Sequence, residues 1–233
     1  ESMAKAKRVT RKQLLKEPDE FITFSGRLIQ FGMAHKNHLV YAAAGLVLIV
    51  AILTGVRFLG NRSEDKASLA LGNVLKSYSE IASQKDVNLI YTTVADGFKA
   101  VIDNYSSRSA GKLARLLFAD LCYKAARYDE AIVLYEKSLK DYSDQPWVKD
   151  LALNGLAYSL EAKGDFAAAV KYYQMIAADS ESILKAQALM NLGRTQAAAG
   201  EKEKSLATFK QLIDQHPDAM YIKLAREYVG QKS

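Results

Sequence analysis

The fold is decided by three stretches of similar sequence, which read FADLCYKAARYDEAIVLY at 118–135, LAYSLEAKGDFAAAVKYY at 156–173 and LGRTQAAAGEKEKSLATF at 192–209. They are offset by 38 and then 36 residues. Each has small residues at three shared positions and an aromatic residue at the last. In order along the unit, the equivalent positions are Ala119, Ala157 and Gly193; Ala126, Gly164 and Gly200; Ala131, Ala169 and Ser205; and Tyr135, Tyr173 and Phe209.

This pattern predicts antiparallel helix pairs stacked on one another. A small residue on the first helix allows the second helix to approach closely, and the aromatic residue fills the space between successive pairs. We expect the chain to reverse at Ala126, Gly164 and Gly200. Because a helix pair cannot bury its apolar face alone, such units occur in stacks. The sequence therefore predicts an all-α fold in which an α-solenoid follows one N-terminal transmembrane helix.

These units resemble tetratricopeptide repeats. Leu192-Gly193, Gly200, Phe209 and Pro217 match the repeat pattern best. The units depart from it where an aromatic residue is expected early in the first helix, because the chain has Arg115, Leu153 and Leu189 there. The resemblance implies that the first helices line a concave groove for an extended peptide or a partner helix.

The groove implied by the resemblance has one set of residues from each unit. Tyr and Arg are frequent binding anchors, and Met adapts to varied partners. A solvated or lightly packed helix face is the alternative for each position. The Lys/Asn clamp of some family members is absent, which disfavours an adaptor for chaperone tails. The predicted protein-binding residues are Leu116, Asp120, Tyr123 and Lys124, then Asn154, Tyr158 and Glu161, then Met190 and Arg194.

An uncharged, mostly apolar run precedes the repeats, NHLVYAAAGLVLIVAILTGV at 37–56. Twenty helical residues span about 30 Å, the thickness of the hydrocarbon core of a bilayer. We expect a transmembrane helix over 37–59. A cleaved signal peptide is not expected, because 36 residues precede the run and no small-residue cleavage site follows closely.

Residues 1–36 form a basic tail that we place in the cytoplasm, since a short basic segment resists translocation. The repeat domain then lies on the outer side of the membrane. Within the tail, Phe21, Phe24, Leu28 and Phe31 form an apolar stripe. The stripe is typical of an interfacial amphipathic helix, and the alternative is an extension of the spanning helix.

The remaining segments complete the predicted domains. Residues 60–111 form a linker and an N-terminal helix pair, 112–219 the three repeats, and 220–233 a C-terminal capping helix. The breaker-rich connection at 106–112 is expected to be a flexible joint.

A wider resemblance follows from the basic tail with its Phe-rich segment, the single span and the divergent repeats. This architecture is similar to the YfgM-like family of single-span bacterial inner-membrane proteins. The resemblance implies a periplasmic repeat domain, and it implies association with the Sec translocon and with periplasmic chaperones.

Catalysis is not expected. The three His residues and the single Cys, Cys122, do not suggest a metal or nucleophile cluster, and no phosphate-binding loop is present. We predict no cofactor and no bound metal. The net charge of +6 is concentrated in the tail, so nucleic-acid binding by the repeats is not expected either.

Taken together, the sequence predicts a non-catalytic, membrane-anchored scaffold that binds protein partners through a periplasmic repeat domain. Two alternatives stay open. One is a structural accessory subunit that docks into a larger inner-membrane complex through its span and tail. The other has the opposite topology, with the repeats in the cytoplasm.

Overall fold

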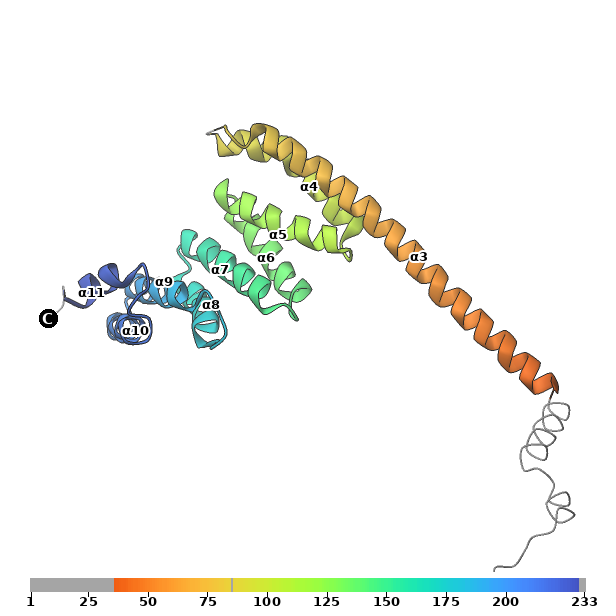
Figure 1. The fold of residues 1–233 in the computed structure, drawn as a ribbon. Coiled ribbons are helices and arrows are strands. Elements are labelled where there is room, and N and C mark those ends of the chain that lie inside the picture. The colour runs from red at the N-terminus through yellow and green to blue at the C-terminus, as the bar shows by residue number, and fades with distance from the viewer. Residues whose placement is uncertain (1–35, 85, 231–233) are drawn as a thin grey trace, which may run out of the picture. The chain divides into compact units, whose positions relative to one another are not determined.

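The computed structural model describes residues 36–84 and 86–230, and every regular element in these ranges is an α-helix (Figure 1). The chain divides into two units, Glu1–Gly60 and Asn61–Ser233. Helix α3 (Lys36–Ile81) contributes residues to both units. The basic tail and the amphipathic helix expected around Phe21–Phe31 lie outside the described residues.

In the first unit, α3 has large apolar side chains that no other described residue of this unit covers. The helix is apolar on every side rather than along one stripe, which is the pattern of a helix in lipid or in a deep core. From Gly45 onward it is long and apolar enough to cross a membrane by length and composition. The exposed apolar residues of this part are Tyr41, Leu46, Val47, Leu48, Ile49, Val50, Ile52, Leu53, Val56, Phe58 and Leu59.

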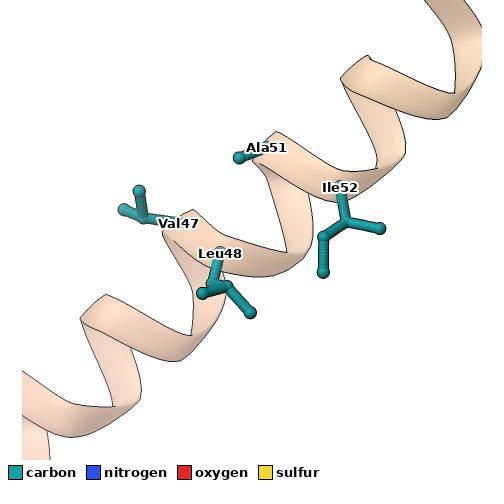
Figure 2. Close-up of a pocket in the computed structure, with 4 residues that line it drawn as sticks. All are labelled: Val47, Leu48, Ala51 and Ile52. Atoms are coloured by element: carbon teal, nitrogen blue, oxygen red, sulfur yellow. The ribbon is translucent and has the colours of Figure 1, made fainter. Parts of the chain in front are cut away.

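Figure 2 shows a shallow pocket on this helix, lined by Val47, Leu48, Ala51 and Ile52. All four residues belong to consecutive turns of α3, so one helix alone forms the pocket. Small-molecule sites combine apolar walls with a few polar groups that orient the ligand. The lining has no polar side chain, and we assign no ligand to it.

The second unit is a series of helix pairs, in which each helix from α4 onward packs against the next one along the chain (Figure 1). Its last helix, α11, closes one end of the stack by packing on α10. The helices that follow α3 are α4 (Val87–Tyr105), α5 (Ser109–Lys124), α6 (Tyr128–Asp141), α7 (Pro146–Ala162), α8 (Phe166–Ala178), α9 (Lys185–Ala198), α10 (Lys202–Gln215) and α11 (Ile222–Gly230).

The three predicted reversals are confirmed by the backbone. Gly164 and Gly200 have φ of 82° and 83°, and Ala126 has φ of 56° at the equivalent position. In each turn the next residue donates its N–H to a carbonyl five residues back, at 2.8–2.9 Å. These are the left-handed C-terminal caps that favour glycine. Ala126 adopts the same conformation although its Cβ makes that conformation unfavourable.

The aromatic positions of the repeat are buried as expected, and the small and aromatic positions meet in the third pair. Tyr135, Tyr173 and Phe209 are all buried. At Gly193 an added Cβ would lie 2.7 Å from the Phe209 ring, and at Gly155 it would lie 2.3 Å from the Tyr135 ring. The close approach of first and second helices therefore depends on residues without side chains at these contacts.

The connection between α4 and α5 corrects the expectation of a flexible joint. Ser109 and Ala110 donate their backbone N–H groups to the Glu64 carboxylate of α3, both at 3.0 Å. An added Cβ at Gly111 would lie 1.8 Å from the Tyr105 carbonyl oxygen. The breaker-rich sequence thus forms a tight, capped turn. Gly111 is needed there because the backbone at Tyr105 comes too close for a side chain.

Candidate protein-binding face

The predicted groove residues lie on α5, α7 and α9, the first helices of the three pairs. The structure brings four of them together: Tyr123, Tyr158, Glu161 and Arg194. Asn191 joins them by a hydrogen bond. We call these five residues the Tyr158 cluster.

Tyr158 lies at the centre of the cluster. Its ring is 6.1 Å from the Tyr123 ring and 5.8 Å from the Tyr173 ring, the second pair in an edge-on arrangement. Its hydroxyl oxygen accepts hydrogen bonds from Asn191 Nδ2 at 2.8 Å and from Gln187 Nε2 at 3.1 Å. Such aromatic pairs stabilise a contact beyond the area that they bury. The cluster thereby ties three consecutive helix pairs into one surface.

Glu161 and Arg194 form a two-point ion pair between α7 and α9. Arg194 Nη2 donates to Glu161 Oε2 at 2.8 Å, and Nη1 donates to Oε1. The Tyr173 hydroxyl also donates to Oε2, at 3.2 Å. The side chain of Glu161 is 12% exposed and that of Arg194 is 40% exposed. The guanidinium therefore reaches the surface with its charge already balanced, in the bidentate geometry that is strongest for Arg and carboxylate.

The electrostatics of the cluster favour neutral tyrosines. Burial raises the pKa of Tyr123, and burial followed by the nearby Glu161 carboxylate raises the pKa of Tyr173. Both phenols are therefore held in the protonated form, and the Tyr173 hydroxyl donates its hydrogen bond to Glu161. The face is consequently aromatic and close to neutral, which suits a partner with apolar and uncharged polar groups better than a strongly acidic one.

The other predicted residues of the first repeat, Leu116, Asp120 and Lys124, lie on α5 with Tyr123. Asp120 and Lys124 form an exposed ion pair at 2.6 Å along one face of α5. Leu116 is partly buried against the core. Asp120 also contributes to a small cavity of about 100 Å³ between α3, α4 and α5.

Met190 does not line an open surface, which corrects its assignment to the groove. It is 4% exposed and packs in the core formed with α8 and α9. The thioether fills space between helices there, a common role of Met. Asn154, at the equivalent position of the preceding pair, is half-buried, and its Oδ1 atom has no hydrogen-bond partner among the described residues.

Sequence reasoning missed Gln187, Asn191 and Tyr173 as members or neighbours of this face. Tyr173 was assigned to the core by its repeat position, and its hydroxyl reaches Glu161 from there. Gln187 and Asn191 have no polar counterpart at the equivalent positions of the preceding pair, which are Leu151 and Gly155. A periodic pattern carries no signal for residues that occur in only one unit.

Cys122 is fully buried, and burial raises the pKa of its thiol to about 12. A reactive cysteine needs the opposite environment, exposed and with a lowered pKa. Among the described residues, His, Cys, Asp and Glu side chains form no group of three that could hold a metal ion.

Comparison with family models identifies the repeats. Residues 116–183 and 187–219 match family models of the tetratricopeptide repeat. The chain therefore carries tetratricopeptide repeats, an α-solenoid fold that generally serves as a non-catalytic scaffold for protein–protein interaction. No curated protein matches the chain.

Among solved structures, the chain is similar to nearly identical TPR-like repeats from a Podosopora anserina protein described as a kinesin light chain. The identity is 14%, with 66% of this chain and 90% of the other covered at a TM-score of 0.46. A single-substitution variant of those repeats gives 13% identity, 66% and 89% coverage and the same TM-score.

Proposed function

We propose that the protein is a non-catalytic scaffold, anchored in a membrane by α3, that binds a protein partner on the face formed by α5, α7 and α9. The Tyr158 cluster carries this proposal. It gathers aromatic rings and a half-exposed Arg on the first helices of a tetratricopeptide stack. Tyr and Arg are, with Trp, the residues enriched among binding hot spots.

The chemistry of the cluster describes the partner. Glu161 already balances Arg194, so a highly charged partner gains little there. Tyr123 and Tyr158 are partly exposed. An extended segment whose apolar or aromatic side chains pack on these two rings fits the face.

Anchoring in lipid is supported by the apolar surface of α3. The run at 37–56 contains ten Leu, Ile and Val residues. Each favours insertion at a helix centre by about 0.3–0.6 kcal/mol, about 3–6 kcal/mol for the ten. The described part of this run has no protein cover within its own unit, so lipid is the environment that removes its side chains from water.

For the setting, we propose the bacterial inner membrane, with the tail in the cytoplasm and the repeats in the periplasm. The basic charge of residues 1–36 supports this orientation. The Sec translocon or a periplasmic chaperone is the partner that the resemblance to the YfgM-like family supports.

Photo-crosslinking in membranes tests the proposal. A benzophenone amino acid at Tyr123 should give a protein adduct, because this ring is part of the proposed binding face. The matched control is Glu136, an exposed residue on a second helix. Equal adduct formation at both positions, or none at Tyr123, would contradict binding by the first helices.

A second function is compatible with the uncovered surface of α3, namely docking of a structural subunit into a larger membrane complex through its span and tail. Deleting residues 1–36 separates the two. Loss of the partner after this deletion, with the crosslink at Tyr123 absent in the intact chain, would favour docking over groove binding.

A further inference from the structure

The second unit has two edges, because its helices alternate in direction. The loops at 106–108, 142–145, 179–184 and 216–221 lie at one edge, where second helices end and first helices begin. We call this the proximal edge, because the unit begins there: Glu64, three residues after Asn61, caps the start of α5. The distal edge carries the loops at 82–86, 125–127, 163–165 and 199–201.

The proximal edge exposes one large apolar residue at each of its last three loops. Trp147 is 63% exposed, Ile183 is 84% exposed and Met220 is 83% exposed. They are separated by 36 and 37 residues, close to the repeat length, so they occupy equivalent positions in successive units. One turn further along α7 and α11, Leu151 and Leu224 are exposed as well.

The loops of the distal edge lack such residues, although Leu89 and Val133, near the starts of α4 and α6, are exposed to about the same extent as Leu224 and Leu151. Among its described residues, which exclude position 85, no large apolar side chain is exposed in any loop. Single exposed apolar residues need no explanation, but a row of them marks a surface that another phase or molecule covers. Core packing does not account for the row, because these side chains point away from the core that their neighbours fill.

A lysine accompanies each apolar position. Lys149 and Lys185 follow Trp147 and Ile183 by two residues, and Lys223 follows Met220 by three. None of these three lysines forms an ion pair with a described residue. Acidic residues also occur in these loops, so the edge is not strongly basic. Apolar tips flanked by unpaired lysines are typical of segments that insert at the level of lipid headgroups.

We propose that the proximal edge lies on the bilayer, with Trp147, Ile183 and Met220 inserted at the interface. This inference rests on the proposed membrane anchor. If α3 crosses the bilayer before Gly60, Asn61 emerges at its surface, and the proximal edge is the part of the second unit next to it. The distal edge is about 25 Å away, the length of α7. Trp is enriched at membrane–water interfaces, together with Tyr.

Trp147 is the only tryptophan in the chain, so its fluorescence reports on this edge without labelling. The full chain is reconstituted in phosphatidylcholine vesicles that carry bromine near the glycerol end of the acyl chains. We expect a blue-shifted emission that these lipids quench and that aqueous iodide does not. Emission of an exposed indole, quenched by iodide and unaffected by bromine, would overturn the proposal.

Two variants sharpen the test. Ile183→Asp with Met220→Asp should weaken the quenching by brominated lipid, because both side chains are exposed and the core is untouched. Trp147→Phe with Glu203→Trp moves the probe to an exposed position at the distal edge, where we expect no quenching by bromine. Equal quenching of both probes would contradict an oriented contact.

Flotation of the same samples separates this inference from the proposed anchor. Protein that floats with vesicles but shows a water-exposed Trp147 overturns the edge contact and leaves the anchor standing. Protein that does not float overturns the anchor itself. A blue shift that depends on protein concentration, without bromine quenching, would assign the edge to a second copy of the chain and also overturn the proposal.

Discussion

Replacing Ala126 by glycine should stabilise the second unit. Ala126 has φ of 56°, while the equivalent turns have glycine at 82° and 83°. The left-handed conformation costs a residue with a Cβ about 1–2 kcal/mol. Glycine avoids that cost but loses about 0.4–1 kcal/mol through the larger freedom of the unfolded chain. The difference predicts a net stabilisation of about 0.5–1 kcal/mol.

The reverse substitution supplies the matched control. Gly164→Ala places a Cβ where no atom lies within 4 Å, so a clash cannot contribute and only the backbone conformation changes. We expect a loss of about 0.5–1 kcal/mol there. Gly200→Ala should behave in the same way, because its surroundings are equally open.

Thermal unfolding of the detergent-solubilised full chain, followed by circular dichroism, measures these effects. In a unit of this size, 1 kcal/mol corresponds to a shift of about 2–4 °C in Tm. Ala126→Gly should raise the midpoint and Gly164→Ala should lower it. A lower midpoint for Ala126→Gly, or an unchanged one for Gly164→Ala, would refute the assignment of these residues to equivalent strained turns.

Three further predictions follow from packing and charge. Gly193→Ala should lower the free energy of unfolding by about 1–3 kcal/mol, because the new Cβ meets the Phe209 ring of α10. Gly72→Ala, which has open space around it, should leave that free energy unchanged or raise it by up to about 1 kcal/mol, and urea unfolding midpoints compare the two variants. The free energy of unfolding should fall as pH rises from about 9 to about 12, because the Cys122 thiol ionises at its usual pKa of 9.0 in the unfolded chain and only near 12 in the folded one. Unfolding midpoints measured against pH should therefore decrease less in Cys122→Ala than in the wild type over this range. Glu161→Gln should cost about 1 kcal/mol after allowance for solvent screening, with part of the loss recovered in the double variant with Arg194→Met, as measured by denaturant unfolding.

The repeat architecture was predictable because the same pattern of small and aromatic residues occurs three times in the sequence. Tyr135, Tyr173 and Phe209 had to fill equivalent spaces, and all are buried. The turns at Ala126 and Gly164 followed from the same alignment, and the backbone confirms them.

Features that occur once could not be found in this way. The departure from the repeat pattern at Arg115 becomes a buried ion pair with Asp141, which no periodicity predicts. Met190 shares a repeat position with half-buried Asn154 but is 4% exposed and belongs to the apolar core cluster, which the spacing alone does not predict. The hydrogen bond from Asn191 to Tyr158 likewise requires the relative positions of two helices that sequence spacing does not supply.

The central claim is that a membrane-held repeat unit binds another protein through the Tyr158 cluster, and affinity purification of variants tests it most directly. The full chain is isolated from gently solubilised membranes as wild type, as Tyr123→Ala with Arg194→Ala, and as Glu136→Ala with Glu203→Ala. We predict that the partner co-purifies with the wild type and with the last variant but is lost from the first pair, although all three fold. Retention of the same partner by the Tyr123 and Arg194 variant would contradict binding at this face.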